Sequence, residues 1–189
     1  MRTIPFKALL LGSLLTLPLA SQAVVIDFDS ETMTFPFNGP VVEDGFSYQG
    51  AGGSLALIDF DGNPGSYMSA VADGVLTITR LGGGLFTFDA ADVVAIGSDA
   101  GATLGFAGYL GGALAASEPF ATTTLWTTLP SSALAGSTID ELRITIAATS
   151  AQSRTGVDNI VLTAVTGTPG QPGADVPEPT SLALLGLGI

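Results

Sequence analysis

Apolar and polar residues alternate along much of this chain with a period of two, and no stretch between residues 24 and 165 shows a capped period of 3.6. The clearest case is residues 142–149, where Leu142 and Ile144 point to one side and Arg143 and Thr145 to the other. This pattern predicts half-buried strands. We expect strands at residues 24–28, 46–48, 54–60, 75–80, 85–88, 93–96, 103–110, 122–129, 139–149 and 156–165.

Turn-forming residues separate these stretches. Glycine, proline, asparagine and aspartate gather at residues 38–40, 50–53, 61–65, 73–74, 82–84 and 111–112. We interpret the glycines at 82–84 as a hairpin turn rather than a phosphate-binding loop, because no helix follows them. Many short strands at this spacing predict an all-β fold, an antiparallel sandwich or barrel.

The two ends of the chain differ from its middle. Arg2 and Lys7 precede an apolar run at residues 8–19, and Ser21-Gln22-Ala23 offers a small-x-small cleavage site. These features predict a secretory signal peptide over residues 1–23, with the mature chain beginning at Val24. A single domain is expected over residues 24–165, and the Pro- and Gly-rich residues 166–175 are expected to form a linker.

Charge and missing residue types exclude several functions. The chain has 5 Lys and Arg against 17 Asp and Glu, and losing Arg2 and Lys7 leaves a mature net charge of −14. Such a surface repels phosphate backbones, so we expect no nucleic-acid partner. Histidine and cysteine are absent and Lys7 is the sole lysine, which excludes Ser-His-Asp and Cys-His triads, ordinary zinc sites and a Schiff base.

The C-terminal residues VPEPTSLALLGLGI, residues 176–189, resemble the start of the PEP-CTERM sorting tail of Gram-negative bacteria. In that family the Pro-Glu-Pro motif precedes a membrane helix and a basic cluster, and an exosortase recognises the tail. The resemblance implies that Pro177, Glu178 and Pro179 form the sorting motif. It also implies export to the outer surface or extracellular matrix, with only transient membrane contact. We expect an incomplete or degenerate tail, since the apolar run ends after eight residues without a basic end.

Three stretches of the domain are similar to PEP-CTERM ectodomains: residues 82–93 (GGGLFTFDAADV), 108–113 (GYLGGA) and 156–162 (GVDNIVL). The last of these also recurs in carbohydrate-binding jelly rolls. The resemblance therefore implies an antiparallel jelly-roll β-sandwich, preceded by the signal peptide and followed by the flexible linker and the partial sorting tail.

Aspartates offer oxygen ligands for a hard cation such as Ca²⁺. Asp59, Asp61 and Asn63 have the spacing that opens an EF-hand loop, but Pro64 follows where glycine is required and Ala70 occupies the position of the closing carboxylate. We therefore exclude an EF-hand and expect a turn here.

A second acidic set joins the ends of the domain. Asp27 and Asp29 lie on the first expected strand, and Asp158 and Asn159 on the last. The resemblance to carbohydrate-binding jelly rolls implies that these strands are neighbours and hold a structural Ca²⁺. The alternative makes Asp158 a hydrogen-bonded residue at the start of its strand and Asp27 a solvent-facing one.

Aromatic residues with a polar edge suit a sugar ligand, and Trp126 and Tyr109 are the candidates for stacking against one, with core packing as the alternative. We expect a non-enzymatic, exported surface or matrix protein that binds polysaccharide. A purely structural or adhesive component is the first alternative. The second is a glycoside-active enzyme using two acids, with the pairs Glu43 and Asp44, Asp89 and Asp92, and Asp140 and Glu141 as candidates.

Overall fold

The computed structural model describes residues 22–32, 34–52, 55–59, 65–70, 73–97, 102–146 and 154–165. Most of the predicted signal peptide, the turn at Asp61 and Asn63, the linker and the sorting motif Pro177-Glu178-Pro179 lie outside these residues. The described residues contain strands and turns and no helix, so the all-β prediction is confirmed for them.

Twelve strands are present in this part of the chain. They are β1 (Ala23–Ile26), β2 (Val41–Glu43), β3 (Phe46–Ala51), β4 (Leu55–Ile58), β5 (Tyr67–Ala70), β6 (Gly74–Arg80), β7 (Phe86–Ile96), β8 (Thr103–Leu110), β9 (Ala113–Ala121), β10 (Thr127–Pro130), β11 (Glu141–Ile146) and β12 (Arg154–Ala164). All pairings between them are antiparallel.

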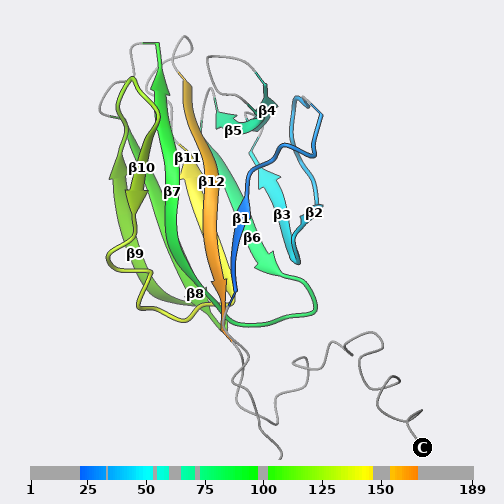
Figure 1. The fold of residues 1–189 in the computed structure, drawn as a ribbon, viewed down its shortest axis with the longest axis vertical. Helices are drawn as coiled ribbons and strands as arrows, with labels where there is room; N and C mark the ends of the chain where they lie inside the picture. Colours follow the sequence, from blue (N-terminus) through cyan, green and yellow to red (C-terminus); the bar gives the residue numbers. More distant parts are fainter. Residues whose placement is uncertain are drawn as a thin grey trace, which may run out of the picture.

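The strands form two six-stranded sheets that pack face to face (Figure 1). The first sheet has the order β10-β7-β12-β5-β4, with β1 also paired to β12. The second has the order β2-β3-β6-β11-β8-β9. From β5 onward, the chain mostly passes between the two sheets, which is consistent with the predicted jelly roll.

The space between the sheets is filled by the apolar half of the alternating pattern. On β11, Leu142, Ile144 and Ile146 are fully buried while Arg143 and Thr145 are exposed, as the sequence predicts. Phe88 of the first sheet stacks on Phe106 of the second with ring centroids 5.0 Å apart. Such contacts join the two sheets through apolar burial and aromatic packing.

Two hairpins have the backbone that their residues favour. Asp44 and Gly45 connect β2 to β3 with φ of 47° and 83°, and Gly111 and Gly112 connect β8 to β9 with φ of 58° and 79°. Two successive positive φ values define a type I′ turn, which asparagine, aspartate and glycine tolerate best. The prediction of a hairpin at residues 82–84 is wrong, because β6 and β7 belong to different sheets.

Several strand predictions also need correction. The predicted strands 85–88 and 93–96 are one strand, β7, and the predicted strand 122–129 begins only at Thr127. The strands β2, β5 and β9 were not predicted. β5 is buried on both faces and so shows no alternation, and β9 contains alanines, Glu118 and Pro119, which have low β propensity.

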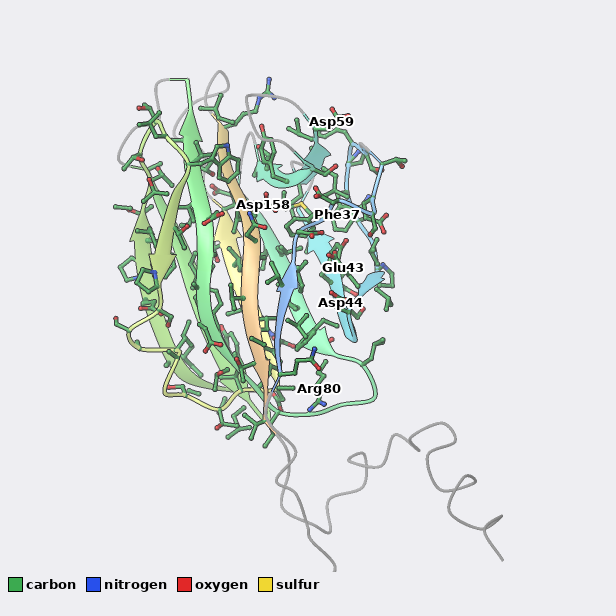
Figure 2. The ribbon with its side chains drawn as sticks, viewed as in Figure 1. Phe37, Glu43, Asp44, Asp59, Arg80 and Asp158 are labelled. Atoms are coloured by element: carbon green, nitrogen blue, oxygen red, sulfur yellow. The ribbon has the colours of Figure 1, made fainter. Side chains whose placement is uncertain are left out.

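The two ends of the described domain lie side by side. Ala23 pairs with Thr163, so the first strand neighbours the last, as expected. The predicted signal-peptide cleavage falls after Ala23, the first residue of β1. Arg80 (labelled in Figure 2) donates from Nη1 to the carbonyl oxygens of Leu85, at 3.5 Å, and Val165, at 3.4 Å. Arg80 thereby joins the β6–β7 connection to Val165, at the end of the described domain.

Candidate functional site

The second sheet has one face in the core and one face turned outward. We call the latter the outer face of the second sheet. Cross-strand pairing places its residues in rows across the sheet, because partners on neighbouring antiparallel strands share a face. One row joins Val42, Ser47, Thr79, Glu141, Tyr109 and Leu114. The next joins Gln49, Thr77, Arg143, Ala107 and Ser117.

A hollow of about 280 Å³ lies on this outer face, above β8. Its floor is Gly105 and Ala107, and Ser117, Pro119 and Thr145 from the flanking strands line its sides. The hollow exists because the floor residues are small. Gly105 has open space above it, since an added Cβ would meet nothing nearer than the Thr145 Cβ at 3.6 Å.

Tyr109 continues the same face of β8, two residues beyond Ala107, and is half-buried. The guanidinium of Arg143 lies over the Tyr109 ring, 4.3 Å from its centroid. Arg143 Nε also donates to Glu141 Oε1 at 2.5 Å. A planar guanidinium held between an aromatic ring and a carboxylate is a preorganised group of hydrogen-bond donors.

Trp126, the other sugar-stacking candidate, lies in the connection between β9 and β10. Its ring meets Tyr67 edge to face at 5.2 Å, and its indole Nε1 is buried with no hydrogen-bond partner among the residues that the structure describes. Together with Leu125, which is 75% exposed, it lines a hollow of about 430 Å³ beside the end of β7. Trp126 therefore packs against a small satellite cluster on the first sheet, and the structure does not bring it near Tyr109.

Asp158 and Asn159 lie within β12 rather than at its start, so the alternative reading of Asp158 as a strand-start residue is wrong (Figure 2). Asp158 is 4% exposed and stands directly opposite Asp92 of β7. Asn159 has φ of 46°, and the register of the β7–β12 pair shifts beside it. Its Nδ2 donates to Asp92 Oδ2 at 2.9 Å and to Asp158 Oδ2 at 3.4 Å. Asp158 and Asn159 thus form a β-bulge, which the hydrogen bonds of the Asn159 side-chain amide stabilise.

Asp27 and Asp29 make different contacts. The backbone N–H of Asp27 donates to Glu43 Oε1 at 3.0 Å, and Asp27 Oδ1 accepts the N–H of Asp29 at 3.0 Å. Asp29 Oδ1 accepts the N–H of Ser66, also at 3.0 Å. Burial raises the pKa of Glu43 to about 7, and the nearby Asp27 carboxylate adds to the increase. Asp27 and Asp29 follow β1, which ends at Ile26, so the expectation that they lie on the first strand is wrong. Their contacts join this segment to β2 and to Ser66, just before β5.

The predicted calcium ligands therefore belong to two hydrogen-bonded groups, one around Asp92 and one around Glu43. In Figure 2, Asp158 lies on β12 and Glu43 at β2. Within the described ranges, no group of three or more acidic side chains is arranged to hold a metal ion. The four residues do not form one ligand set there, and calcium binding stays a prediction.

The candidate catalytic residues Asp89, Asp92, Asp140 and Glu141 all make hydrogen bonds or ion pairs within the fold. Asp89 accepts hydrogen bonds from Thr87 and Thr163, and Thr128 donates to Asp92. Asp140 Oδ2 accepts the N–H of Gly111 at 2.8 Å and so braces the β8–β9 turn. Glu141 is paired with Arg143 on the outer face. Each of these carboxylates has a structural partner that accounts for its position.

Glu118 is a further buried acid that sequence reasoning did not single out. Its carboxylate accepts the hydroxyls of Ser131 and Ser132 and the backbone N–H groups of Ser132, Ala133 and Leu134. Burial raises its pKa, but these hydrogen bonds outweigh burial and leave the pKa below its usual value. The only sequence signal is the serine pair, 13 residues downstream.

No protein-family model and no curated protein matches this chain. Some solved structures are similar in fold. A family 29 carbohydrate-binding module from Piromyces equi is 12% identical, with a TM-score of 0.46, and the match covers 78% of this chain and 93% of the module. TmCBM61 in complex with β-1,4-galactotriose is 10% identical, with a TM-score of 0.41, over 65% of this chain and 90% of that one. Sequence identities and TM-scores this low do not assign the chain to a family.

Among the residues that the structure covers, no helix is long and apolar enough to cross a membrane.

Proposed function

We propose that this protein is an exported, non-enzymatic surface or matrix protein that binds polysaccharide through the outer face of its second sheet. The observation that carries the proposal is the hollow over Gly105 and Ala107, next to the Tyr109 ring and the Arg143 guanidinium. The resemblance of the chain's ends to a signal peptide and a PEP-CTERM tail supports export and sorting through Glu178 by an exosortase.

The chemistry of a sugar fits this face. A sugar ring presents C–H groups on its faces and hydroxyls around its edge. Tyr109 supplies an amphipathic ring, one face of which the Arg143 guanidinium covers, and the small floor residues let a flat ligand approach the backbone. Arg143 supplies fixed donors, while Ser117 and Thr145 supply hydroxyls that both donate and accept. Because these groups lie on rigid strands, they lose little conformational freedom on binding, which limits the entropic cost of association.

The test is a glycan array with the purified protein and two variants that act by different means. Tyr109→Ala removes the ring, and Gly105→Val fills the hollow at a position with room for a side chain. Losing the half-buried Tyr109 ring should weaken binding by about tenfold, or ~1.4 kcal/mol. Leu125→Ala is the matched control, because Leu125 is exposed in the β9–β10 connection, beside the first sheet and away from the proposed site. Loss of binding in Leu125→Ala, with both site variants unaffected, would place the site elsewhere. If the wild-type protein binds no glycan, the proposal fails and the alternative of a structural or adhesive component is favoured instead.

A further inference from the structure

Arg143 carries a charge that its neighbours have already compensated. Its Nε contacts Glu141 Oε1 at 2.5 Å, and its guanidinium covers the Tyr109 ring. Glu141 and Arg143 are two residues apart on β11, so both side chains project from the same face of the sheet. The pair is partly open to solvent, since the side chains of Arg143 and Glu141 are 46% and 27% exposed.

The other residues of the two outer-face rows described above are uncharged. Besides this one ion pair, these two rows contain threonine, serine, glutamine, alanine, valine, leucine and tyrosine. Arg143 is thus the sole cation in those rows among the residues that the structure describes. The whole chain carries a formal net charge of −12. A polyanionic ligand approaching this face meets a neutralised arginine, a carboxylate and an acidic protein.

Resting on the proposed polysaccharide binding, we propose that Glu141 makes the site selective for uncharged polysaccharides by neutralising Arg143. A uronate or sulfate bound to the Arg143 guanidinium would lie beside the Glu141 carboxylate, which repels it and already compensates the positive charge. A neutral sugar meets no such repulsion, and the guanidinium nitrogens not bound to Glu141 can donate to its hydroxyl oxygens. Glu141 is therefore a specificity-determining residue that acts mainly by disfavouring acidic polysaccharides.

The hypothesis predicts a change of specificity in Glu141→Gln. Glutamine keeps the length of the side chain but frees the positive charge of Arg143. The ratio of affinity for acidic over neutral polysaccharide should rise by about fivefold at low salt, the size expected for an exposed charge pair. The gain should decrease as salt is raised, because salt screens exposed charges.

The experiment is affinity gel electrophoresis of the full-length protein in gels containing galactomannan or xyloglucan as neutral probes and alginate or polygalacturonate as acidic ones. The control is Asp44→Asn, which removes one negative charge at an exposed turn where asparagine tolerates the positive φ. Asp44→Asn should change the ratio by less than about twofold, since only a distant charge is lost.

The outcomes separate the two proposals. If no polysaccharide retards the wild-type protein, the proposed function fails. If the wild-type protein binds and prefers alginate or polygalacturonate, polysaccharide binding stands and selectivity for uncharged ligands is overturned. An equal shift in Glu141→Gln and Asp44→Asn would also overturn the role of Glu141, since net charge alone would then explain the change. A larger shift in Glu141→Gln, lost at high salt, is the expected result.

Discussion

Glu118 provides the sharpest test of how this sandwich is held closed. Glu118 lies on β9 and is 9% exposed, and its carboxylate binds the segment from Ser131 to Leu134, at the start of the β10–β11 connection. Leu134 is fully buried in the core cluster, so this segment contributes to packing as well as to hydrogen bonding. Replacing Glu118 with alanine removes the carboxylate from all of these donors at once, and among the described residues only the Leu134 N–H keeps a second acceptor, Ser131 Oγ at 3.0 Å.

The expected cost follows from those donors. Glu118→Ala leaves three backbone N–H groups without the carboxylate, one of them on the buried Leu134. Losing the charged acceptor in a largely buried site should cost about 3 kcal/mol in the free energy of unfolding. For a domain of this size the melting temperature should fall by about 10 °C. Glu118→Gln keeps one carbonyl acceptor and should cost about half as much.

The effect should also depend on pH. Since folding lowers the pKa of Glu118 below the ordinary value of 4.5, its carboxylate stabilises the folded state above about pH 4.5. That stabilisation is lost as the pH falls through the lowered pKa of the folded state. The difference between wild type and Glu118→Gln should therefore be largest near neutral pH and shrink in acid.

Urea unfolding followed by the fluorescence of the single tryptophan, Trp126, measures these differences between pH 3 and pH 7. Asp44→Asn is the control for loss of an exposed carboxylate. A change of less than about 0.5 kcal/mol in Glu118→Ala would refute the reasoning, because that is the size expected of an ordinary surface substitution. So would a wild-type advantage over Glu118→Gln that stays constant down to pH 3.

Two further predictions concern the calcium hypothesis and export. If Ca²⁺ binds only the folded state, it should raise the melting temperature, and a Ca²⁺ concentration of a hundred times Kd should add ~2.7 kcal/mol to the free energy of unfolding. The Asp158→Ala variant should lose this gain, and the Asp44→Ala variant should keep it. Coincident thermal scans with calcium and with chelator would exclude the site. For export, intact-mass measurement should show a mature chain beginning at Val24, and a chain still beginning at Met1 would contradict this. Glu178→Ala should disturb final placement without altering the fold, and unchanged surface display of this variant would contradict the sorting role.

Local pattern predicted the strands that alternate. The bounds of β8 match the predicted strand 103–110, and the buried and exposed sides of β11 match their prediction. In these strands one face meets the core and the other meets solvent, which is the condition under which a period of two appears in sequence. β7 was predicted in two pieces, residues 85–88 and 93–96, and the residues between them include Asp89 and Asp92, which have low β propensity. Hydrogen bonds from Thr163 of β12 and Thr128 of β10 let these acids remain inside a strand.

The candidate site was predictable only in part. Tyr109 was identified as an amphipathic aromatic, but its neighbours Arg143 and Glu141 come from a strand more than 30 residues away in sequence. No local pattern reports which strands become neighbours. The same holds for Asp158, whose partner Asp92 lies on another strand. Adjacency of the first and last strands was expected from the resemblance to jelly rolls, and the pairing of β1 with β12 confirms it.

Chemical-shift mapping tests the central claim most directly. Backbone amide resonances of the labelled protein would be followed while a neutral oligosaccharide from the best-binding polysaccharide is added. We predict that the largest shifts occur on the outer face of the second sheet, at Gly105, Ala107, Tyr109 and Arg143. Shifts centred instead on Leu125 and Trp126 beside the first sheet would contradict the account.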